Sequence, residues 1–310
     1  MRPGGVSAER RAARRVRARA LLSIAAILLG LSGCATSSLG IGLNAKTRAR
    51  EANEAALCAR RRELSESAQE ALDRQDPTSA ESILHQLVDL DPKSAEAYLR
   101  LGRIVQSEGR IEEAAAMYRK ALELDHEYAT AMIGLGSIDL LRGRPDTALP
   151  RFDAAIEINP RNSDAHLERA KALDALGRYD DALAAYFRAL EIAPTSFTAR
   201  LRVAAIQLDR GENDQALARL DPLVDQYPDD PEAHYQRGRA HLALNHLAPA
   251  LEDLKLASEK LPDRPDVHYQ LARAFAADHK TKLALDSAAR ALQLAPDNAD
   301  ARALTEQLRR

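Results

Sequence analysis

The sequence has few of the residues that usually fill a large single core. It has 310 residues, no tryptophan and only 4% aromatic residues. With 29% charged residues and a mean hydropathy of −0.37, it is too polar for a protein with many membrane-spanning helices. Hydrophobic residues nevertheless make up 45% of the chain, which excludes extensive disorder. The chain must therefore bury its apolar surface with few aromatic side chains.

Five of the 14 prolines recur at intervals of 34 residues. They are Pro160, Pro194, Pro228, Pro262 and Pro296, and the same interval leads back to His126 and then to Pro92. A fixed period of this length is typical of a repeat array, in which each unit packs on its neighbours. Such an array needs no single large core, which agrees with the small number of aromatic residues.

The first 33 residues have the composition of a secretory signal. Residues 1–19 contain seven arginines and one acidic residue, Glu9, and an apolar stretch from Ala20 to Leu31 follows directly. This stretch is shorter than the roughly 20 apolar residues that a membrane-spanning helix needs. Its place after a basic segment is typical of a signal peptide. An arginine-rich transit peptide is the alternative.

The signal ends in Leu31-Ser32-Gly33-Cys34, which resembles the lipobox of bacterial lipoproteins. The resemblance implies cleavage after Gly33, a diacylated Cys34 and an acylated new amino terminus. Two or three acyl chains anchor a protein stably, at about 0.8 kcal/mol for each buried methylene. Ala35 stands where lipoproteins retained at the inner membrane often have Asp, so we expect an outer-membrane anchor with the protein facing the periplasm. An ordinary cleaved signal with an incidental cysteine is the alternative.

Removal of the signal would make the protein acidic. Residues 1–33 take seven arginines and one glutamate with them, which leaves 37 basic and 45 acidic residues and a net charge of −8. A nucleic-acid-binding protein would present a basic face, so we expect no nucleic-acid partner. With Cys34 lipidated, Cys58 would have no partner within the chain. We interpret Cys58 as a small, partly buried apolar residue, with a disulfide between two chains as the alternative.

A 34-residue frame that places Pro92 and its successors at position 32 divides most of the chain into seven repeats. These are residues 61–94, 95–128, 129–162, 163–196, 197–230, 231–264 and 265–298. Position 20 is alanine in every repeat, namely Ala80, Ala114, Ala148, Ala182, Ala216, Ala250 and Ala284. Residues 34–60 then hold the lipidated cysteine, a tether and a leading helix from Ala45, and residues 299–310 form a capping helix.

These repeats resemble the tetratricopeptide repeat. The block Ala95-Glu96-Ala97-Tyr98-Leu99-Arg100-Leu101-Gly102, followed by Gly109 and Ala114, is similar to the consensus of that family. The resemblance implies an all-α fold, in which seven helix-turn-helix repeats form a right-handed α-solenoid that ends in the capping helix. No cofactor is implied.

Recurrent small and special residues give this fold a physical basis. Position 8 is always alanine or glycine, which lets the two helices of a repeat approach closely. Glycine at position 15, as in Gly109 and Gly143, can adopt the left-handed conformation that ends the first helix. Proline at position 32 ends the second helix, because it lacks an N–H group. Pro222, at position 26, is expected to kink its helix.

The eight histidines are the obvious candidates for a catalytic or metal site. His166, His234 and His268 share position 4 but lie a repeat or more apart, too far to share a metal with bonds near 2 Å. We therefore predict a structural role for them. The spacing of His234, His241 and His246 places only the first two on one helix face. Motifs for zinc proteases, nucleophile elbows, phosphate loops and dinucleotide binding are missing from the sequence, and we predict no enzyme activity.

The resemblance places the concave surface at positions 2, 5, 9 and 12 of the first helix of each repeat. Positions 5 and 9 combine an apolar row with an interrupted basic row. The candidate residues of this groove are Leu99, Arg103, Ile133, Leu167, Lys171, Leu201, Tyr235, Arg239, Tyr269 and Arg273. Such a surface suits an extended or helical protein segment with apolar anchors and acidic groups.

An alternative interpretation leaves no groove. The residues at positions 5 and 12 would then contact neighbouring helices, and the basic residues would pair with the acids at position 2. Those acids are Glu96, Asp164, Glu232 and Asp266. The family's carboxylate clamp for chaperone tails uses Lys at position 5 and Asn at position 9, and this sequence has neither, so we do not expect that ligand.

Together these features predict a lipid-anchored scaffold of the bacterial envelope that holds protein segments. Its resemblance to pilotin-like and cell-wall-enzyme adaptor lipoproteins suggests type IV pilus or secretin assembly, polysaccharide export or wall remodelling. An enzyme or a metal-handling protein is the hypothesis from another class.

Overall fold

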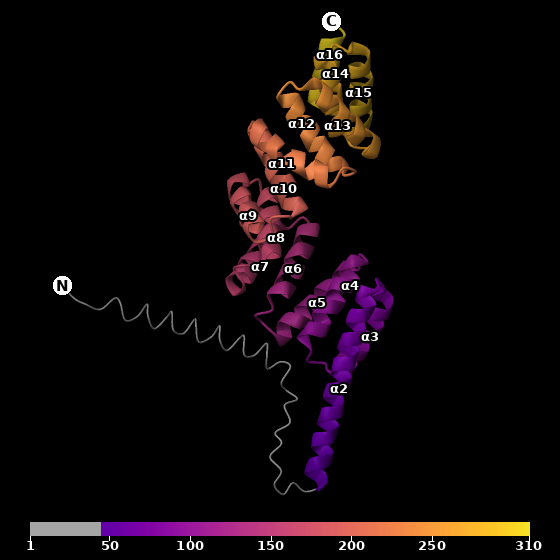
Figure 1. Cartoon of the computed structure of the whole chain (residues 1–310), viewed down its shortest axis with the longest axis vertical. Coiled ribbons are helices and arrows are strands. Elements are labelled where there is room, and N and C mark those ends of the chain that lie inside the picture. The colour runs from indigo at the N-terminus through magenta and orange to yellow at the C-terminus, as the bar shows by residue number, and fades with distance from the viewer. Residues whose placement is uncertain (1–44) are drawn as a thin grey trace, which may run out of the picture. The chain divides into compact units, whose positions relative to one another are not determined.

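The computed structural model describes residues 45–310, and all regular structure in this span is α-helical. The helices are α2 (Ala45–Asp73), α3 (Pro77–Leu90), α4 (Ala95–Ser107), α5 (Ile111–Leu124), α6 (Ala129–Leu141), α7 (Pro145–Ile158), α8 (Ser163–Ala175), α9 (Tyr179–Ile192), α10 (Phe197–Asp209), α11 (Asn213–Gln226), α12 (Pro231–Ala243), α13 (Leu247–Lys260), α14 (Pro265–Ala277), α15 (Thr281–Leu294) and α16 (Ala299–Leu308) (Figure 1). The predicted all-α fold is confirmed.

The described chain divides into two compact units, and the boundary lies within α4, between Ile104 and Val105. In the first unit, α2 is one continuous helix of 29 residues that runs from the leading segment into the first helix pair. Its later half packs on α3 through small and apolar side chains. These are Leu64, Ala68 and Ala71 of α2 and Ala80, Leu84 and Leu87 of α3, all buried.

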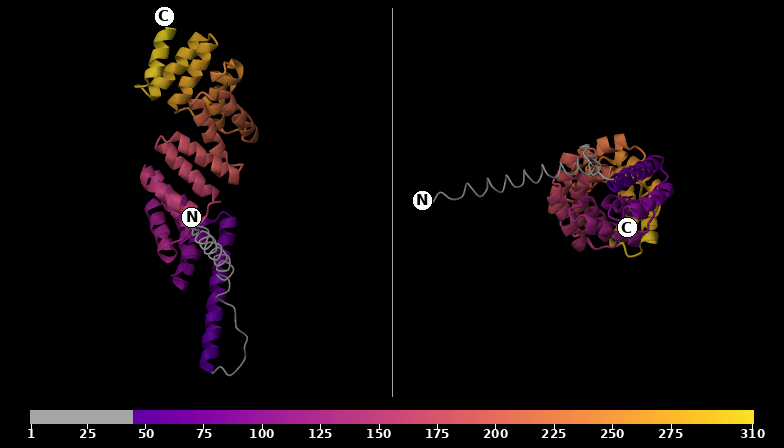
Figure 2. Two further views of the ribbon diagram at one scale, coloured as in Figure 1. Left: turned by 90° about the vertical axis from the view of Figure 1, so that its left-hand side faces the viewer. Right: turned by 90° about the horizontal axis from the view of Figure 1, so that it is seen from below.

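In the second unit, consecutive helices pack as pairs in chain order. The pairs are α6 with α7, α8 with α9, α10 with α11, α12 with α13 and α14 with α15. The second helix of each pair also contacts the first helix of the next pair, and first helices such as α10 and α12 contact each other. Figure 2 shows this order from the magenta helices to the yellow α16. Each helix is thus stabilised by its neighbours along the chain, as in other repeat proteins.

Close approach of the two helices in a pair depends on residues without large side chains. The seven alanines at position 20 are all fully buried. At position 8, a Cβ atom added to Gly136 would lie 2.5 Å from the ring of the buried Phe152. A Cβ atom added to Gly134 would lie 2.6 Å from the ring of Tyr118, which belongs to the preceding pair. Tyr118 and Phe152 both stand at position 24 of their repeats. Large side chains at this position therefore fill the space that the small residues leave open.

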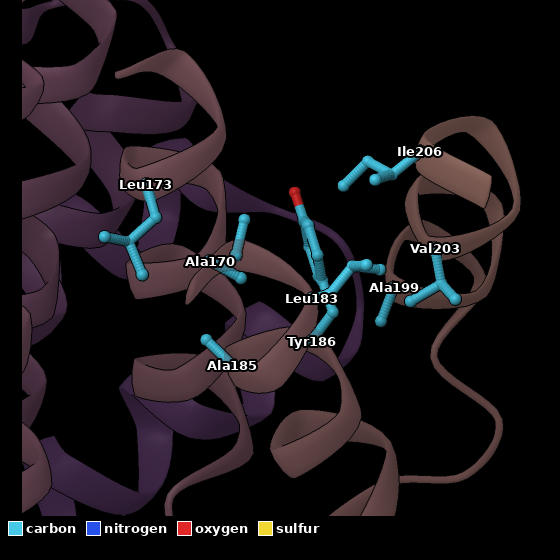
Figure 3. Packing of buried hydrophobic residues seen from close by; sticks show 9 residues of the cluster. Ala170, Leu173, Leu183, Ala185, Tyr186, Ala199, Val203 and Ile206 are labelled. Carbon is cyan, nitrogen blue, oxygen red and sulfur yellow. The ribbon is translucent and has the colours of Figure 1, made fainter. Parts of the chain in front are cut away.

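The cluster around Tyr186 shows how this packing connects three helices (Figure 3). Tyr186 of α9 is fully buried and lies between residues of α8 and α10. Its neighbours in the cluster include Ala170 and Leu173 from α8 and Ala199 and Val203 from α10. One aromatic ring thus serves both its own helix pair and the next, so few aromatic residues suffice.

The turns within the pairs need a left-handed residue, and glycine is not the only residue that provides it. Gly109, Gly143, Gly177 and Gly211 have φ between 68° and 78°. The equivalent positions of the other pairs are Gln75, Asn245 and His279, with φ of 59°, 61° and 58°. The backbone geometry is therefore kept where the sequence signal for it is lost. Pro222 lies inside α11, which continues through it to Gln226.

Candidate functional site

The histidines at position 4 bind the loop that precedes their own helix. The Nε2 atoms of His166, His234 and His268 lie 3.0, 2.8 and 2.9 Å from the carbonyl oxygens of Pro160, Pro228 and Pro262. Arg302 of α16 makes the same contact, with its Nη2 donating to Pro296 O at 2.8 Å. These side chains satisfy carbonyl groups at the turn between consecutive pairs. A structural role, as predicted, accounts for them.

His234 also belongs to a buried charged cluster that the sequence did not indicate. Its Nδ1 lies 2.6 Å from Oδ1 of Asp253, a residue of α13 that is only 1% exposed. Arg237 donates from Nε and Nη2 to the two oxygens of the same carboxylate, each at 2.8 Å. These hydrogen bonds raise the pKa of Arg237, although partial burial acts against them. The cluster fastens α12 to α13 with a paired charge.

The arrangement of two further histidines differs from the prediction. The spacing assigned His241 to the face of His234 and separated it from His246, yet the Nδ1 atoms of His241 and His246 are 3.4 Å apart. The turn at Asn245 reverses the chain between them and brings His246 to the start of α13. Burial lowers the pKa of His241. Within residues 45–310, no three His, Cys, Asp or Glu side chains are arranged to hold a metal ion.

The candidate apolar row is largely covered by neighbouring helices. In the first unit, Leu99 is buried on α4. In the second unit, Leu201 and Tyr235 are buried, whereas Ile133 and Leu167 are half-buried and pack against the clusters around Phe152 and Tyr186. Tyr269 of α14 is also half-buried. These side chains serve the packing first, and Tyr269 has the larger accessible part of the two tyrosines.

The basic row has partners other than those expected. Lys171 Nζ lies 2.6 Å from Glu168 Oε1, and Arg239 Nη2 lies 2.6 Å from Asp209 Oδ1. Arg273 is exposed and donates from Nη1 to Gln270 Oε1 at 2.9 Å. Arg103, in the first unit, is exposed as well.

Three of the position-2 acids bind arginines outside the basic row. For these three acids, the alternative interpretation that they pair with the basic row is wrong. Glu96 binds Arg100 in the first unit, with an N–O distance of 2.6 Å. In the second unit, Arg264 Nη1 lies 2.7 Å from Glu232 Oε2, and the same guanidinium pairs with Asp266. Arg264 follows Pro262 in the loop before α14, a position that the repeat pattern leaves variable.

Tyr235 is enclosed by this network. The guanidinium carbons of Arg264 and Arg239 lie 5.2 and 5.7 Å from its ring centre, and its hydroxyl bonds to Asp266. Burial raises the pKa of Tyr235, and the negative charge of Asp266 adds to this effect. Arginine over an aromatic face is favourable by about 0.5 to 2 kcal/mol. The ring is therefore held rigidly on α12.

Each unit has a surface hollow. The hollow of the first unit, about 740 Å³, is lined by α2 and by residues from Leu87 to Arg100. In the second unit, a hollow of about 440 Å³ lies beside Lys171, Asp174, Tyr186 and Arg202. Asp174 accepts a hydrogen bond of 2.9 Å from Arg202 Nε and one of 3.3 Å from the Tyr186 hydroxyl. The polar groups beside this second hollow are thus already hydrogen-bonded to one another.

The two cysteines are Cys34 and Cys58. Cys34, the predicted lipid site, lies outside the described residues. Cys58, on α2, is disulfide-bonded, so its interpretation as a plain apolar residue is wrong. Among the described helices, none has the length and apolarity needed to cross a membrane.

Comparison with protein families decides what these helix pairs are. Three sequence models of the tetratricopeptide repeat match residues 93–161, 133–197 and 176–240. Residues 93–240 of the chain are tetratricopeptide repeats. The matched region covers both units in part and ends within α12. No curated protein matches the chain.

Several solved structures have similar folds, and they include a tetratricopeptide repeat protein. This protein, from Parabacteroides merdae, is 21% identical, with 81% of this chain and 100% of the other covered and a TM-score of 0.53. The Pseudomonas aeruginosa pilF structure is 18% identical, with 69% and 97% covered and a TM-score of 0.61. The Cut9–Hcn1 structure of the APC/C is 16% identical, with 75% and 48% covered and a TM-score of 0.63. At these identities the likeness concerns the fold alone.

Proposed function

We propose that this tetratricopeptide repeat protein is a scaffold that holds a protein segment against α12 and α14. The observation that carries the proposal is a pair of tyrosine and arginine residues at the same positions of both helices. Arg239 stacks over Tyr235 at 5.7 Å, and Arg273 stacks over Tyr269 at 5.9 Å. Tyrosine and arginine are the residue types that contribute most at protein interfaces. A fold of stacked helix pairs supports such a role in protein–protein interaction.

The rigidity of this surface supports the same function. Tyr235 is fixed by Arg264 and Asp266, and Arg239 is fixed by Asp209 and Gln236. Side chains that are already ordered lose little conformational entropy when a partner binds. An enzyme or a metal-handling protein remains the competing hypothesis, and nothing in the described geometry favours it.

We further propose that the protein is a lipoprotein of the bacterial envelope, with Cys34 as the anchor and the outer membrane as its place. The support is the signal sequence and its lipobox-like end. Assembly of envelope complexes is then the proposed process. A pilotin-like role in type IV pilus or secretin assembly, or an adaptor role for cell-wall or polysaccharide-export enzymes, is the alternative within this class.

The disulfide at Cys58 sets a condition on the anchor. The sequence contains two cysteines, so a disulfide of Cys58 within the chain would use the Cys34 sulfur. A sulfur that carries a lipid thioether cannot also form a disulfide. The lipoprotein proposal therefore requires that Cys58 be reduced, or paired between two chains, in the mature protein.

Crosslinking in the native host tests the scaffold proposal. A photoreactive amino acid in place of Tyr269 should give a light-dependent adduct with a protein that mass spectrometry identifies. The same residue in place of the exposed Tyr179 on α9 is the control and should not give this adduct. Arg239→Glu with Arg273→Glu should reduce the adduct about tenfold or more, since charge-assisted contacts are worth roughly 1.5 to 3 kcal/mol. Helical circular dichroism should be retained. An adduct that is unaffected by the double substitution would contradict the proposal.

A further inference from the structure

Helices α12 and α14 carry the same arrangement of three residues, at a spacing of 34 residues. In α12 it consists of Tyr235, Gln236 and Arg239, and in α14 of Tyr269, Gln270 and Arg273. In both, the arginine donates from Nη1 to the glutamine Oε1, at 2.8 and 2.9 Å. In both, it also lies over the tyrosine ring, at 5.7 and 5.9 Å. Two neighbouring helices thus aim an arginine in the same way.

The two arrangements differ in the partner of the arginine's Nη2 atom. Nη2 of Arg239 is 2.6 Å from Oδ1 of Asp209, the last residue of α10, which contacts α12. The equivalent last residue of α12, which contacts α14, is Ala243. Alanine has no carboxylate to offer. Within residues 45–310, no carboxylate oxygen lies within ion-pair distance of Arg273.

We infer that an acidic side chain of the bound segment pairs with Arg273 in the way that Asp209 pairs with Arg239. This inference rests on the proposed scaffold function and adds the chemistry of the partner. Asp209 is a model of the occupant within the protein itself, and it is a side-chain carboxylate. The partner is therefore a protein segment with an aspartate or glutamate side chain that reaches α14.

The surroundings of Arg273 agree with an acidic occupant. Gln270 fixes the guanidinium through Nη1 without neutralising it, and the guanidinium lies over the ring of Tyr269. Asp278, the nearest acid after α14 in the sequence, is engaged by Lys280 at 2.6 Å. A planar guanidinium held in this way binds a carboxylate through fixed donors. Aspartate or glutamate next to an apolar side chain would satisfy both the arginine and the tyrosine.

A substitution that supplies the missing carboxylate tests the inference. Ala243→Asp places an acid on α12 where Asp209 stands on α10, and it should pair with Arg273 within the chain. Ala243→Asn is the matched control, because it has the same shape and no charge. The probe is a library of N-acetylated, C-amidated octapeptides, and the readout is sequence enrichment by the full chain followed by Kd measurement on the enriched peptides.

We expect the unaltered chain to enrich peptides with aspartate or glutamate at one position. Arg273→Gln and Ala243→Asp should each weaken binding of these peptides about tenfold, as expected for the loss of a charge-assisted hydrogen bond. Ala243→Asn should leave it unchanged. Peptides in which that acid is replaced by its amide should bind all four proteins alike.

Two results would overturn the inference. The first is enrichment without an acidic position, and the second is an acidic preference that survives Arg273→Gln. Each of these leaves the scaffold proposal intact, because peptides are still bound. If the unaltered chain enriches no peptide, both the scaffold proposal and the inference fail.

Discussion

At the residue scale, the fold depends on glycines that leave room for a neighbouring side chain. The ring of Phe152 occupies the place that a Cβ atom of Gly136 would need, and Leu254 does the same opposite Gly238. The sequence reveals these positions, because small residues recur at position 8. It does not reveal Gly134, which faces Tyr118 of another helix pair. The need for glycine at this position comes from a side chain of the preceding repeat. Because only one repeat has this glycine, it adds nothing to the periodic pattern.

Gly136→Ala should destabilise the protein. The added methyl would lie 2.5 Å from a ring that is fully buried, so the helices must separate. Overpacking typically costs about 1 to 3 kcal/mol, and the better helix propensity of alanine returns less than about 1 kcal/mol. Urea unfolding followed by circular dichroism measures the net loss.

The control for this substitution is the double variant Gly136→Ala with Phe152→Leu. The smaller side chain makes room for the methyl group, so the effect of Gly136→Ala should be smaller in the Phe152→Leu background than in the unaltered chain. Equal losses in the two backgrounds would show that the ring is not the cause.

At the element scale, each helix pair depends on one left-handed residue in its turn. The sequence predicted this residue where it is glycine, from Gly109 to Gly211. The family models match these same turns, and they end before the turns at Asn245 and His279. Repeats that lack the glycine keep the left-handed turn because the packing of their helices holds it in place. The periodic sequence pattern shows this packing only weakly.

His279→Gly should stabilise the protein. A residue other than glycine costs roughly 1 to 2 kcal/mol in the left-handed region, whereas glycine loses about 0.5 to 1 kcal/mol of entropy on folding. We expect a net gain of about 0.5 kcal/mol in the free energy of unfolding, measured by urea titration. The backbone N–H of residue 279 can still donate to Ala276 O.

Lys280→Gly is the matched control for the turn. Its φ is −90°, so glycine relieves no strain there and should not stabilise the protein. Equal gains from the two glycine variants would contradict the explanation by left-handed geometry.

At the scale of the whole molecule, the repeat array provides the proposed binding surface. The predicted signal sequence at residues 1–33 determines the compartment in which we expect that surface to bind its partner. The all-α fold and its helix pairs were predictable because every repeat carries the same pattern. The candidate groove was predictable only in part, since the position-5 residues serve packing and ligand contact alike. Tyr235 is covered by Arg264, and Arg239 is paired with Asp209. Neither Arg264 nor Asp209 stands at a position that the pattern singles out.

Cys34→Ala should release the protein from membranes if the anchor is lipid. The variant has no sulfur to carry acyl chains, and two or three chains are what holds such a protein on a bilayer. Fractionation of cells followed by immunoblotting measures the membrane-bound share. Cys58→Ala is the matched control, because it removes the other cysteine but keeps the proposed lipid site, and it should remain in the membrane fraction. A Cys34→Ala protein that stays in the membrane after a high-salt wash would contradict lipidation.

The bond between a position-4 side chain and a proline carbonyl spans only six residues of chain. It lies at the turn between two helix pairs, and both of its ends belong to one short local segment. A designer who moves a helix pair together with its preceding loop, such as residues 228–260, would therefore carry this junction along with it. The contact between His234 and Pro228 could therefore be transferred intact when longer or shorter arrays are built.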